Sequence, residues 1–253
     1  MPNLRIKSVL KKSVDPGIKI EYDKTNKIRP SWIKLKKPDK RIKGVHIKYG
    51  KWRWTYVKYL ADYFLPTDYN KEDMQKLYDH WSHEYDRDVR AAKHNEKAMK
   101  FTISLLLKHC KPSNQKIIDI GCGSGLAAGV FLKNGFADIT NLDLSSKMLA
   151  IAKKRFPKCK FVHVDFLNFK TREKYDIISS FFSFGAGSYY TPEEVKIGIK
   201  KIKSMLKKGG FIVIHGHIDL SLFEPEFKTI YSGTYILNKE KNYKTTYYIG
   251  KKR

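Results

Sequence analysis

Three glycines and one carboxylate are concentrated between residues 116 and 126, in the string Lys-Ile-Ile-Asp-Ile-Gly-Cys-Gly-Ser-Gly-Leu. Gly121, Gly123 and Gly125 leave the backbone bare, so a ligand can approach main-chain groups that a side chain would cover. Asp119 precedes them and would repel a pyrophosphate, and the G-x-G-x-G spacing differs from the G-x-G-x-x-G of dinucleotide sites. These residue types favour a cationic ligand without phosphates.

A strand and a helix must hold this glycine loop. Residues 117–120 are an apolar run of strand length, and the apolar run 126–132 has helical length. The helix start presents free N–H groups and a partial positive charge to whatever lies above it.

Two further carboxylates end the next predicted strands. Asp143 closes the strand that begins at Asp138 and lies 18 residues beyond Gly125. A carboxylate at that place can accept both hydroxyls of a ribose held above the first loop. Asp165 closes the third strand, which begins at Lys160. Each has a simpler interpretation, because aspartates also cap turns and helices at strand ends.

The string from Asp119 to Gly125 resembles the first motif of the class I methyltransferases that use S-adenosylmethionine. The resemblance covers residues 71–253 and implies an α/β domain, with a seven-stranded, mostly parallel sheet flanked by helices and an antiparallel last strand. It implies S-adenosyl-L-methionine as cofactor and S-adenosyl-L-homocysteine as product. The residues it assigns to the cofactor are Tyr85, Asp119, Gly121, Gly123, Gly125, Asp143, Leu144, Met148, Asp165, Phe166 and Ser180.

Within that set, the resemblance implies contacts of Asp119 with the methionine moiety, Asp143 with the ribose and Asp165 with the adenine amino group. Phe166 would lie beside the adenine ring. Tyr85 enters because residues 78–86 resemble a pocket-capping segment of small-molecule methyltransferases, and an ordinary buried tyrosine fits equally well. Leu144 and Met148 stand where the family lines its adenine pocket, and either could instead belong to the core.

The acceptor side is less defined. Loops after the carboxyl ends of parallel strands form the ligand crevice, so the loop 183–190 should face the substrate. It lacks the Asn-Pro-Pro-Tyr or Asp-Pro-Pro-Tyr string that marks methylation of nucleobase or glutamine amino groups in this superfamily. Tyr189, Tyr190 and His215 are weak candidates for a catalytic base, and a structural role is the simpler interpretation of His215. A small, anionic acceptor is the first prediction.

Residues 1–70 form a separate, basic extension in this prediction. The chain carries a net charge of +26, and residues 1–70 hold 18 basic and 6 acidic side chains. Period-two alternation around Gly50 predicts a β-hairpin with Trp52 and Trp54 on one face. Those aromatics could stack on bases, or pack on the core with the basic face in water. An RNA (tRNA or rRNA) methyltransferase is therefore the alternative function, and compositional drift explains the charge equally well.

Other features bound the class of protein. Cys110, Cys122 and Cys159 lack the spacing of a disulfide framework or a zinc site, and no window is apolar enough to span a membrane. We expect a soluble, cytoplasmic enzyme without a metal. A second alternative is a binding protein on the same fold that does not catalyse transfer.

Overall fold

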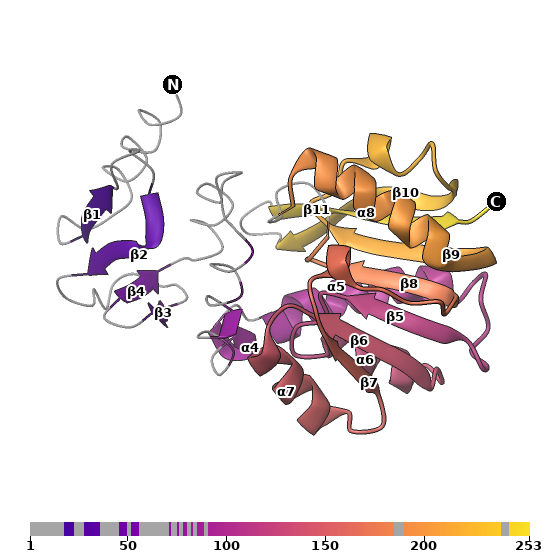
Figure 1. Cartoon of the computed structure of the whole chain (residues 1–253), viewed down its shortest axis with the longest axis horizontal. Coiled ribbons are helices and arrows are strands. Elements are labelled where there is room, and N and C mark those ends of the chain that lie inside the picture. The colour runs from indigo at the N-terminus through magenta and orange to yellow at the C-terminus, as the bar shows by residue number, and fades with distance from the viewer. Residues whose placement is uncertain are drawn as a thin grey trace.

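The computed structural model describes residues 91–184, 190–238 and 243–253, four strands between residues 18 and 55, and the residues 71, 75, 78, 79, 82 and 85–88. In the N-terminal part, β1 (Ile18–Tyr22) pairs antiparallel with β2 (Ile28–Leu35). The predicted hairpin is present as β3 (His46–Tyr49) and β4 (Trp52–Thr55) (Figure 1). The side chains of these strands lie outside the described part, so the interpretation of the aromatic face stays a prediction.

One seven-stranded sheet forms the main domain, in the order β10-β11-β9-β8-β5-β6-β7. Neighbours from β9 to β7 are parallel, whereas β11 is antiparallel to β9 and β10 is antiparallel to β11. The predicted fold class is confirmed. The strands are β5 (Lys116–Ile120), β6 (Asp138–Asp143), β7 (Lys160–His163), β8 (Tyr175–Phe181), β9 (Leu206–Gly216), β10 (Lys228–Asn238) and β11 (Tyr243–Lys251).

Helices connect the parallel strands. The helices of the main domain are α5 (Ala91–Leu106), α6 (Leu126–Lys133), α7 (Ser146–Arg155) and α8 (Pro192–Met205), with the short helix α4 (Tyr85–Asp88) and the turns η1 (Phe166–Asn168) and η2 (Leu220–Leu222). Local sequence sets their starts: Ser145 caps α7, and α8 opens with a capping box of Thr191 and Glu194. In the segment before α4, residues 71, 75, 78 and 79 are helical.

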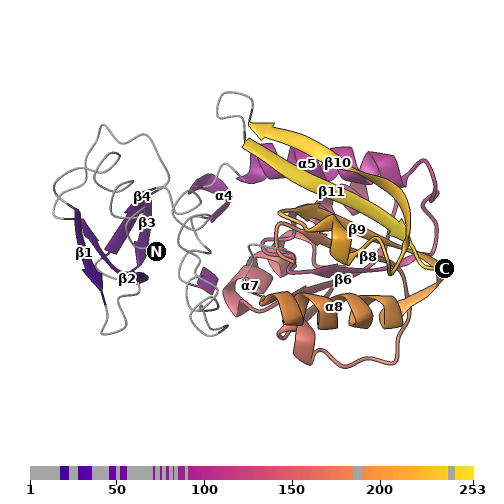
Figure 2. The same ribbon diagram turned by 90° about the horizontal axis from the view of Figure 1, so that it is seen from above.

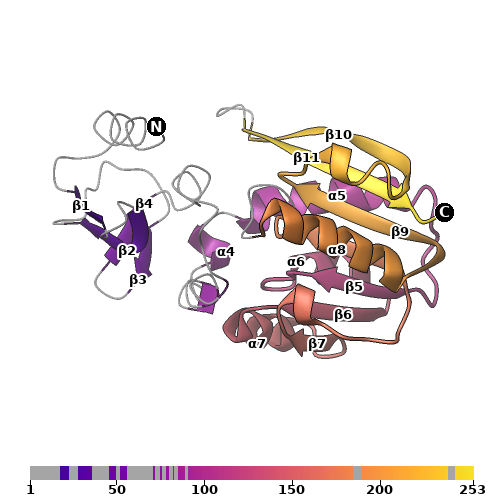
Figure 3. The same cartoon turned by 45° about the horizontal axis from the view of Figure 1, so that its top comes forward.

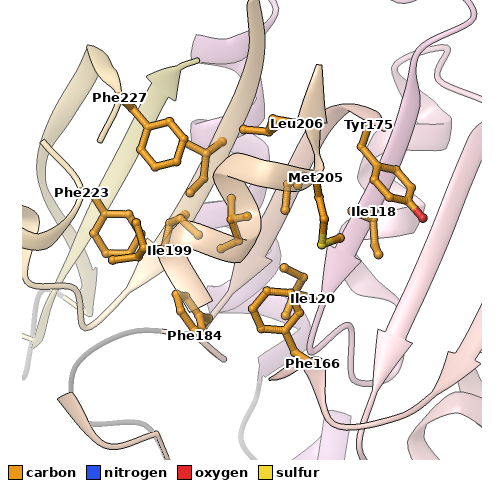
Figure 4. Packing of buried hydrophobic residues seen from close by; sticks show 14 of the residues in the cluster. Ile118, Ile120, Phe166, Tyr175, Phe184, Ile199, Met205, Leu206, Phe223 and Phe227 are labelled. Atoms are coloured by element: carbon orange, nitrogen blue, oxygen red, sulfur yellow. The ribbon is translucent and has the colours of Figure 1, made fainter. Parts of the chain in front are cut away.

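Apolar side chains cover both faces of the sheet, and α8 and the pair α5 and α6 lie on opposite faces (Figures 2 and 3). Strand alternation explains the division. Ile118 and Ile120 of β5 pack on the α8 face with Phe166 and Phe184 (Figure 4), whereas Ile117 packs against α5 and α6.

One element boundary differs from the prediction. The third strand ends at His163, because Asp165 caps the turn η1 instead of continuing the ladder. Strand β9 begins at Leu206, directly after α8. The Gly209–Gly210 pair stays in the sheet because the N–H of Gly209 donates to Lys252 O at 3.1 Å and the N–H of Lys252 donates to Gly210 O at 2.9 Å.

Cys110, Cys122 and Cys159 are free thiols. Within the described ranges, three or more potential metal ligands gather nowhere. Among those same residues, no helix has the length and apolar character needed to cross a membrane.

Candidate functional site

The glycine loop between β5 and α6 has left-handed backbone at its three glycines, with φ of +66° at Gly121, +53° at Gly123 and +83° at Gly125. A Cβ added to Gly121 would lie 1.7 Å from Oγ of Ser183, and one added to Gly125 would lie 3.1 Å from Cβ of Ala152. At Gly123, by contrast, no described atom comes within 4 Å of the added Cβ. Two glycines therefore pack against the protein, and the third faces a space that no described residue fills, as a ligand approaching the backbone requires.

One carboxylate holds the loop in this shape. Asp143, the last residue of β6, accepts the N–H of Gly123 on Oδ2 at 2.7 Å and the N–H of Ser145 on Oδ1 at 2.8 Å. Desolvation raises the pKa of Asp143, the two N–H bonds oppose that rise, and the charge of Asp79 adds to it. Asp143 is only partly buried, and each carboxylate oxygen keeps a second lone pair. It can still accept hydrogen bonds from ligand hydroxyls.

Asp119 lies deeper, at 1% exposure, and its Oδ1 accepts from Oγ of Ser179 at 2.7 Å. Burial raises the pKa of Asp119 to about 7; the bond from Ser179 lowers it and the charge of Asp143 raises it. Asn141 stands opposite Asp119 on β6, and its buried Oδ1 has no hydrogen-bond partner among the described residues. A row of three polar side chains thus crosses the sheet next to the glycine loop, with a carboxyl that titrates near neutral pH.

Asp165 meets a lysine from the segment before the main domain. Its Oδ1 accepts the N–H of Leu167 at 3.2 Å, and its Oδ2 lies 2.8 Å from Nζ of Lys71. Lys71 also pairs with Oε1 of Glu194 at 2.8 Å and lies 5.4 Å from the ring centroid of Tyr190. Burial alone would lower the pKa of Lys71, but the two carboxylates raise it above its ordinary value. The expected adenine-side carboxylate therefore belongs to an ion-pair cluster.

Two aspartates of the same segment contact neighbouring connections. Asp79 Oδ1 accepts from Oγ of Ser145 at 2.6 Å and from a main-chain N–H in the first turn of α7 at 3.1 Å. Asp86 Oδ1 accepts from Oγ of Ser124 at 2.7 Å, and its Oδ2 pairs with Arg155 at 2.5 Å. We call the described residues between 71 and 88 the strap. It contacts the connections that follow β5, β6 and β7.

The end of β8 is tied to the strands on both sides. Ser180 is buried; its Oγ donates to Ile120 O at 2.9 Å and accepts the N–H of Phe184 at 3.1 Å. Phe182 has a φ of 59°, uncommon for a residue with a side chain, and its N–H donates to His215 O at 2.6 Å. Such backbone strain often occurs at functional sites, and here it lies one residue before the serine that covers Gly121.

His215 sits in a closed polar network at 1% exposure. Nδ1 lies 2.7 Å from Oγ1 of Thr102, which itself donates to Ala98 O at 3.0 Å, whereas Thr245 has a longer bond of 3.4 Å to Tyr235 O, so the tautomer with the proton on Nδ1 is favoured. Nε2 then accepts from Oγ1 of Thr245 at 2.9 Å. Burial lowers the pKa of His215 to about 4. These contacts favour the structural interpretation of this histidine.

The predicted adenine-side residues differ in exposure. Met148 and Phe166 are each 1% exposed, and the ring of Phe166 packs against Phe184 with centroids 5.7 Å apart. Leu144 is partly exposed, and its carbonyl accepts from Nε2 of His163 at 2.9 Å.

Of the three predicted tyrosines, Tyr85 and Tyr190 are described. Tyr85 is partly exposed in α4, with its ring centroid 6.0 Å from that of Tyr78. Tyr190 is 9% exposed, and its hydroxyl lies 3.5 Å from Oδ1 of Asp165. Tyr189 lies outside the described residues.

Sequence reasoning missed Lys71, Asp79 and Arg155. Lys71 and Asp79 bond to residues 94 and 66 positions away along the chain, beyond the reach of any local pattern. Asp86 had a weak signal, because it directly follows the predicted Tyr85.

Parts of this chain are similar to known methyltransferases. Residues 117–210 match a family described as a methyltransferase domain. A dTDP-3-amino-3,4,6-trideoxy-alpha-D-glucopyranose N,N-dimethyltransferase of Streptomyces venezuelae is 30% identical over 112 residues, which are 44% of this chain and 46% of that protein. The chain thus spans about half the length of this curated relative.

Solved structures show the same fold. Magnesium protoporphyrin IX methyltransferase of Synechocystis PCC 6803, solved with bound SAM, aligns with a TM-score of 0.57 and 15% identity over 75% of this chain and 98% of its own. N-methyltransferase NodS of Bradyrhizobium japonicum WM9, in complex with S-adenosyl-L-homocysteine, aligns with a TM-score of 0.55 and 15% identity over 63% of this chain and 88% of its own.

Proposed function

We propose that this chain, whose residues 117–210 form a methyltransferase domain of class I fold, transfers a methyl group from S-adenosyl-L-methionine to a small molecule. The observation that carries the proposal is the open glycine loop. Gly123 leaves room above its backbone, and Asp143 fixes the loop while keeping lone pairs for a ligand.

The residues around this opening suit such a ligand. Asp143 would accept from the ribose hydroxyls, Asp165 from the adenine amine, and Asp119 would face the ammonium of the methionine moiety. Because ionised aspartates attract positive charge and repel a phosphate, this set suits a cationic ligand. The hydroxyl of Ser179, which donates to Oδ1 at 2.7 Å, would hold the carboxylate of Asp119 in place near the end of β5.

S-adenosylmethionine supplies an electrophilic methyl carbon on its sulfonium. The chain must hold the acceptor in line with that carbon at about 3 to 3.5 Å and exclude water. The strap can exclude water, because it contacts three successive connections of the sheet. An acceptor that must lose a proton needs a base, for which Tyr189 and Tyr190 remain candidates; both nitrogens of His215 are already bonded.

Two arguments support a small-molecule acceptor. By their names, the Streptomyces venezuelae protein methylates a nucleotide sugar, and the Synechocystis protein methylates a porphyrin. In addition, the loop 183–190 lacks the Pro-Pro-Tyr string. RNA is the second candidate, because residues 1–70 hold 18 basic and only 6 acidic side chains, and RNA is an anion.

Calorimetry with S-adenosyl-L-homocysteine tests the cofactor, and transfer of labelled methyl groups in cell extract tests the acceptor. We expect binding, with label in the small-molecule fraction. Label in RNA, together with RNA binding that weakens steeply with salt, would favour the RNA alternative. Ligand binding without any transfer would favour a non-catalytic binding protein, and absence of binding would contradict the proposal.

A further inference from the structure

Lys71 is a cation that pairs with Asp165, the expected adenine-side carboxylate. Its Nζ lies 2.8 Å from Asp165 Oδ2 and 2.8 Å from Glu194 Oε1, and its side chain is 29% exposed. Lys71 thereby joins the strap to the start of the turn η1 and to the start of α8. Lys71 lies outside residues 117–210, the part of the chain that matches the methyltransferase family.

The contacts of Asp165 divide between its two oxygens. Oδ2 is engaged by Lys71 at 2.8 Å and by Nδ2 of Asn168 at 3.4 Å. Among the described residues, Oδ1 accepts longer bonds, from the N–H of Leu167 at 3.2 Å and the hydroxyl of Tyr190 at 3.5 Å. The lysine thus fixes one oxygen with a short, charge-assisted bond, and the weak bond from Tyr190 to the other oxygen is the one that a ligand N–H would replace.

Glu194 keeps Lys71 in this position. Its Oε2 accepts the N–H of Thr191 at 2.9 Å as part of the capping box, so the carboxylate that holds the lysine is itself fixed to a helix start. The lysine stands between two carboxylates whose positions are set by different elements. If the ammonium of Lys71 moved with one carboxylate, it would lose its contact with the other.

We propose that Lys71 is a positioning residue for adenine recognition: it holds Oδ2 of Asp165 so that Oδ1 faces the adenine amino group. The inference rests on the proposed function, since it concerns the cofactor of that reaction. Without Lys71, the carboxylate can rotate and adapt to other base edges, so discrimination between bases falls.

The test compares two ligands that differ at one group of the base. S-adenosyl-L-homocysteine carries the exocyclic amine, and S-inosyl-L-homocysteine carries a carbonyl oxygen there, which a fixed carboxylate oxygen repels. The wild-type chain should bind the adenosyl ligand roughly 10- to 100-fold more tightly than the inosyl ligand, the range for a bond to a charged group. Lys71→Gln should reduce that ratio at least about fivefold, and Lys71→Arg should restore most of it.

Two control variants separate positioning from other effects. Lys201 Nζ lies 5.4 Å from the ring centroid of Phe166 and bonds to Leu167 O at 2.7 Å, so it is a lysine of the same neighbourhood that touches no oxygen of Asp165. Lys201→Gln should leave the ratio unchanged. Asp79→Asn weakens the strap at α7 and should lower the affinity for both ligands alike.

The outcomes are distinguishable. A ratio unchanged or increased in Lys71→Gln would overturn the inference, the increase indicating that Lys71 competes with adenine. Equal reductions in Lys71→Gln and Lys201→Gln would also overturn it, since net charge alone would then be responsible. If the wild-type chain binds neither ligand, the proposed function itself fails.

Discussion

The two halves of the carboxyl edge of the sheet are built differently. After β5 and β6, short polar side chains bond to the backbone of the loops and leave Gly123 facing open space. Near the ends of β8 and β9, the side chains of Ser180 and His215 bond to other protein groups and are buried. The first half keeps hydrogen-bonding groups available for a ligand. In the second half, the hydrogen bonds of the polar side chains join strands to one another and to α5.

The largest effect in the first half should come from Asp143→Ala. The substitution removes the bonds to Gly123 and Ser145, and we expect roughly 100-fold weaker binding of S-adenosyl-L-homocysteine by calorimetry. Asp176→Ala is the matched control, because Asp176 Oδ2 also accepts a main-chain N–H, that of Lys116 at 2.8 Å, at the opposite edge. Similar losses of affinity in both variants would contradict a special role for the first half.

In the second half, His215→Ala should act on stability. The substitution leaves a cavity and removes the partner of Thr102 and Thr245, so we expect a loss of about 3 kcal/mol in the free energy of unfolding by urea titration. His217→Ala, at an exposed position, should cost far less. Lost methyl transfer with unchanged stability would instead indicate a catalytic His215.

The same histidine predicts a pH effect. Its pKa of about 4 in the fold lies below the ordinary 6.5, so the unfolded chain takes up the proton first. Neutral His215 therefore contributes up to about 3 kcal/mol to the free energy of unfolding. This contribution is complete above pH 6.5 and is lost as the pH falls toward 4. His215→Gln should flatten urea-derived stability across this window.

Asp119 should make ligand binding depend on pH. With a pKa raised to about 7, the carboxyl is half protonated at neutral pH in the ligand-free chain, and the proposed ammonium contact needs the ionised form. Affinity for S-adenosyl-L-homocysteine should fall about tenfold per pH unit below 7 and level off above it. Asp119→Asn should remove the dependence. A flat profile in the wild-type chain would place the ammonium elsewhere.

The smallest effect should come from Gly123→Ala. The left-handed backbone should cost about 1 kcal/mol in stability, and the methyl group enters the open space, so we expect roughly fivefold weaker ligand binding. Gly209→Ala has comparable strain, with φ of +75°, at the other edge of the sheet, and should lower stability without changing affinity. Equal affinities of the two variants would show that the space above Gly123 is not used.

The sequence was most informative where function follows from neighbouring residues. The strand, the glycine loop and the helix start around Gly121 form one continuous segment, and Asp143 ends a strand at a predictable distance, so the fold and the first half could be predicted. Lys71, Asp79 and the His215 network depend on contacts between distant segments. Residue type alone cannot indicate such contacts, because the local sequence does not distinguish a solvent-exposed lysine or histidine from one that bonds to a distant segment.

The pairing of Lys252 with the Gly209–Gly210 turn has a practical consequence for these measurements. It fastens the end of β11 beside the start of β9, at the margin remote from the glycine loop. A fluorophore or surface linker joined at Arg253 would point away from the ligand opening. Immobilised chain should therefore bind nucleosides as freely as chain in solution.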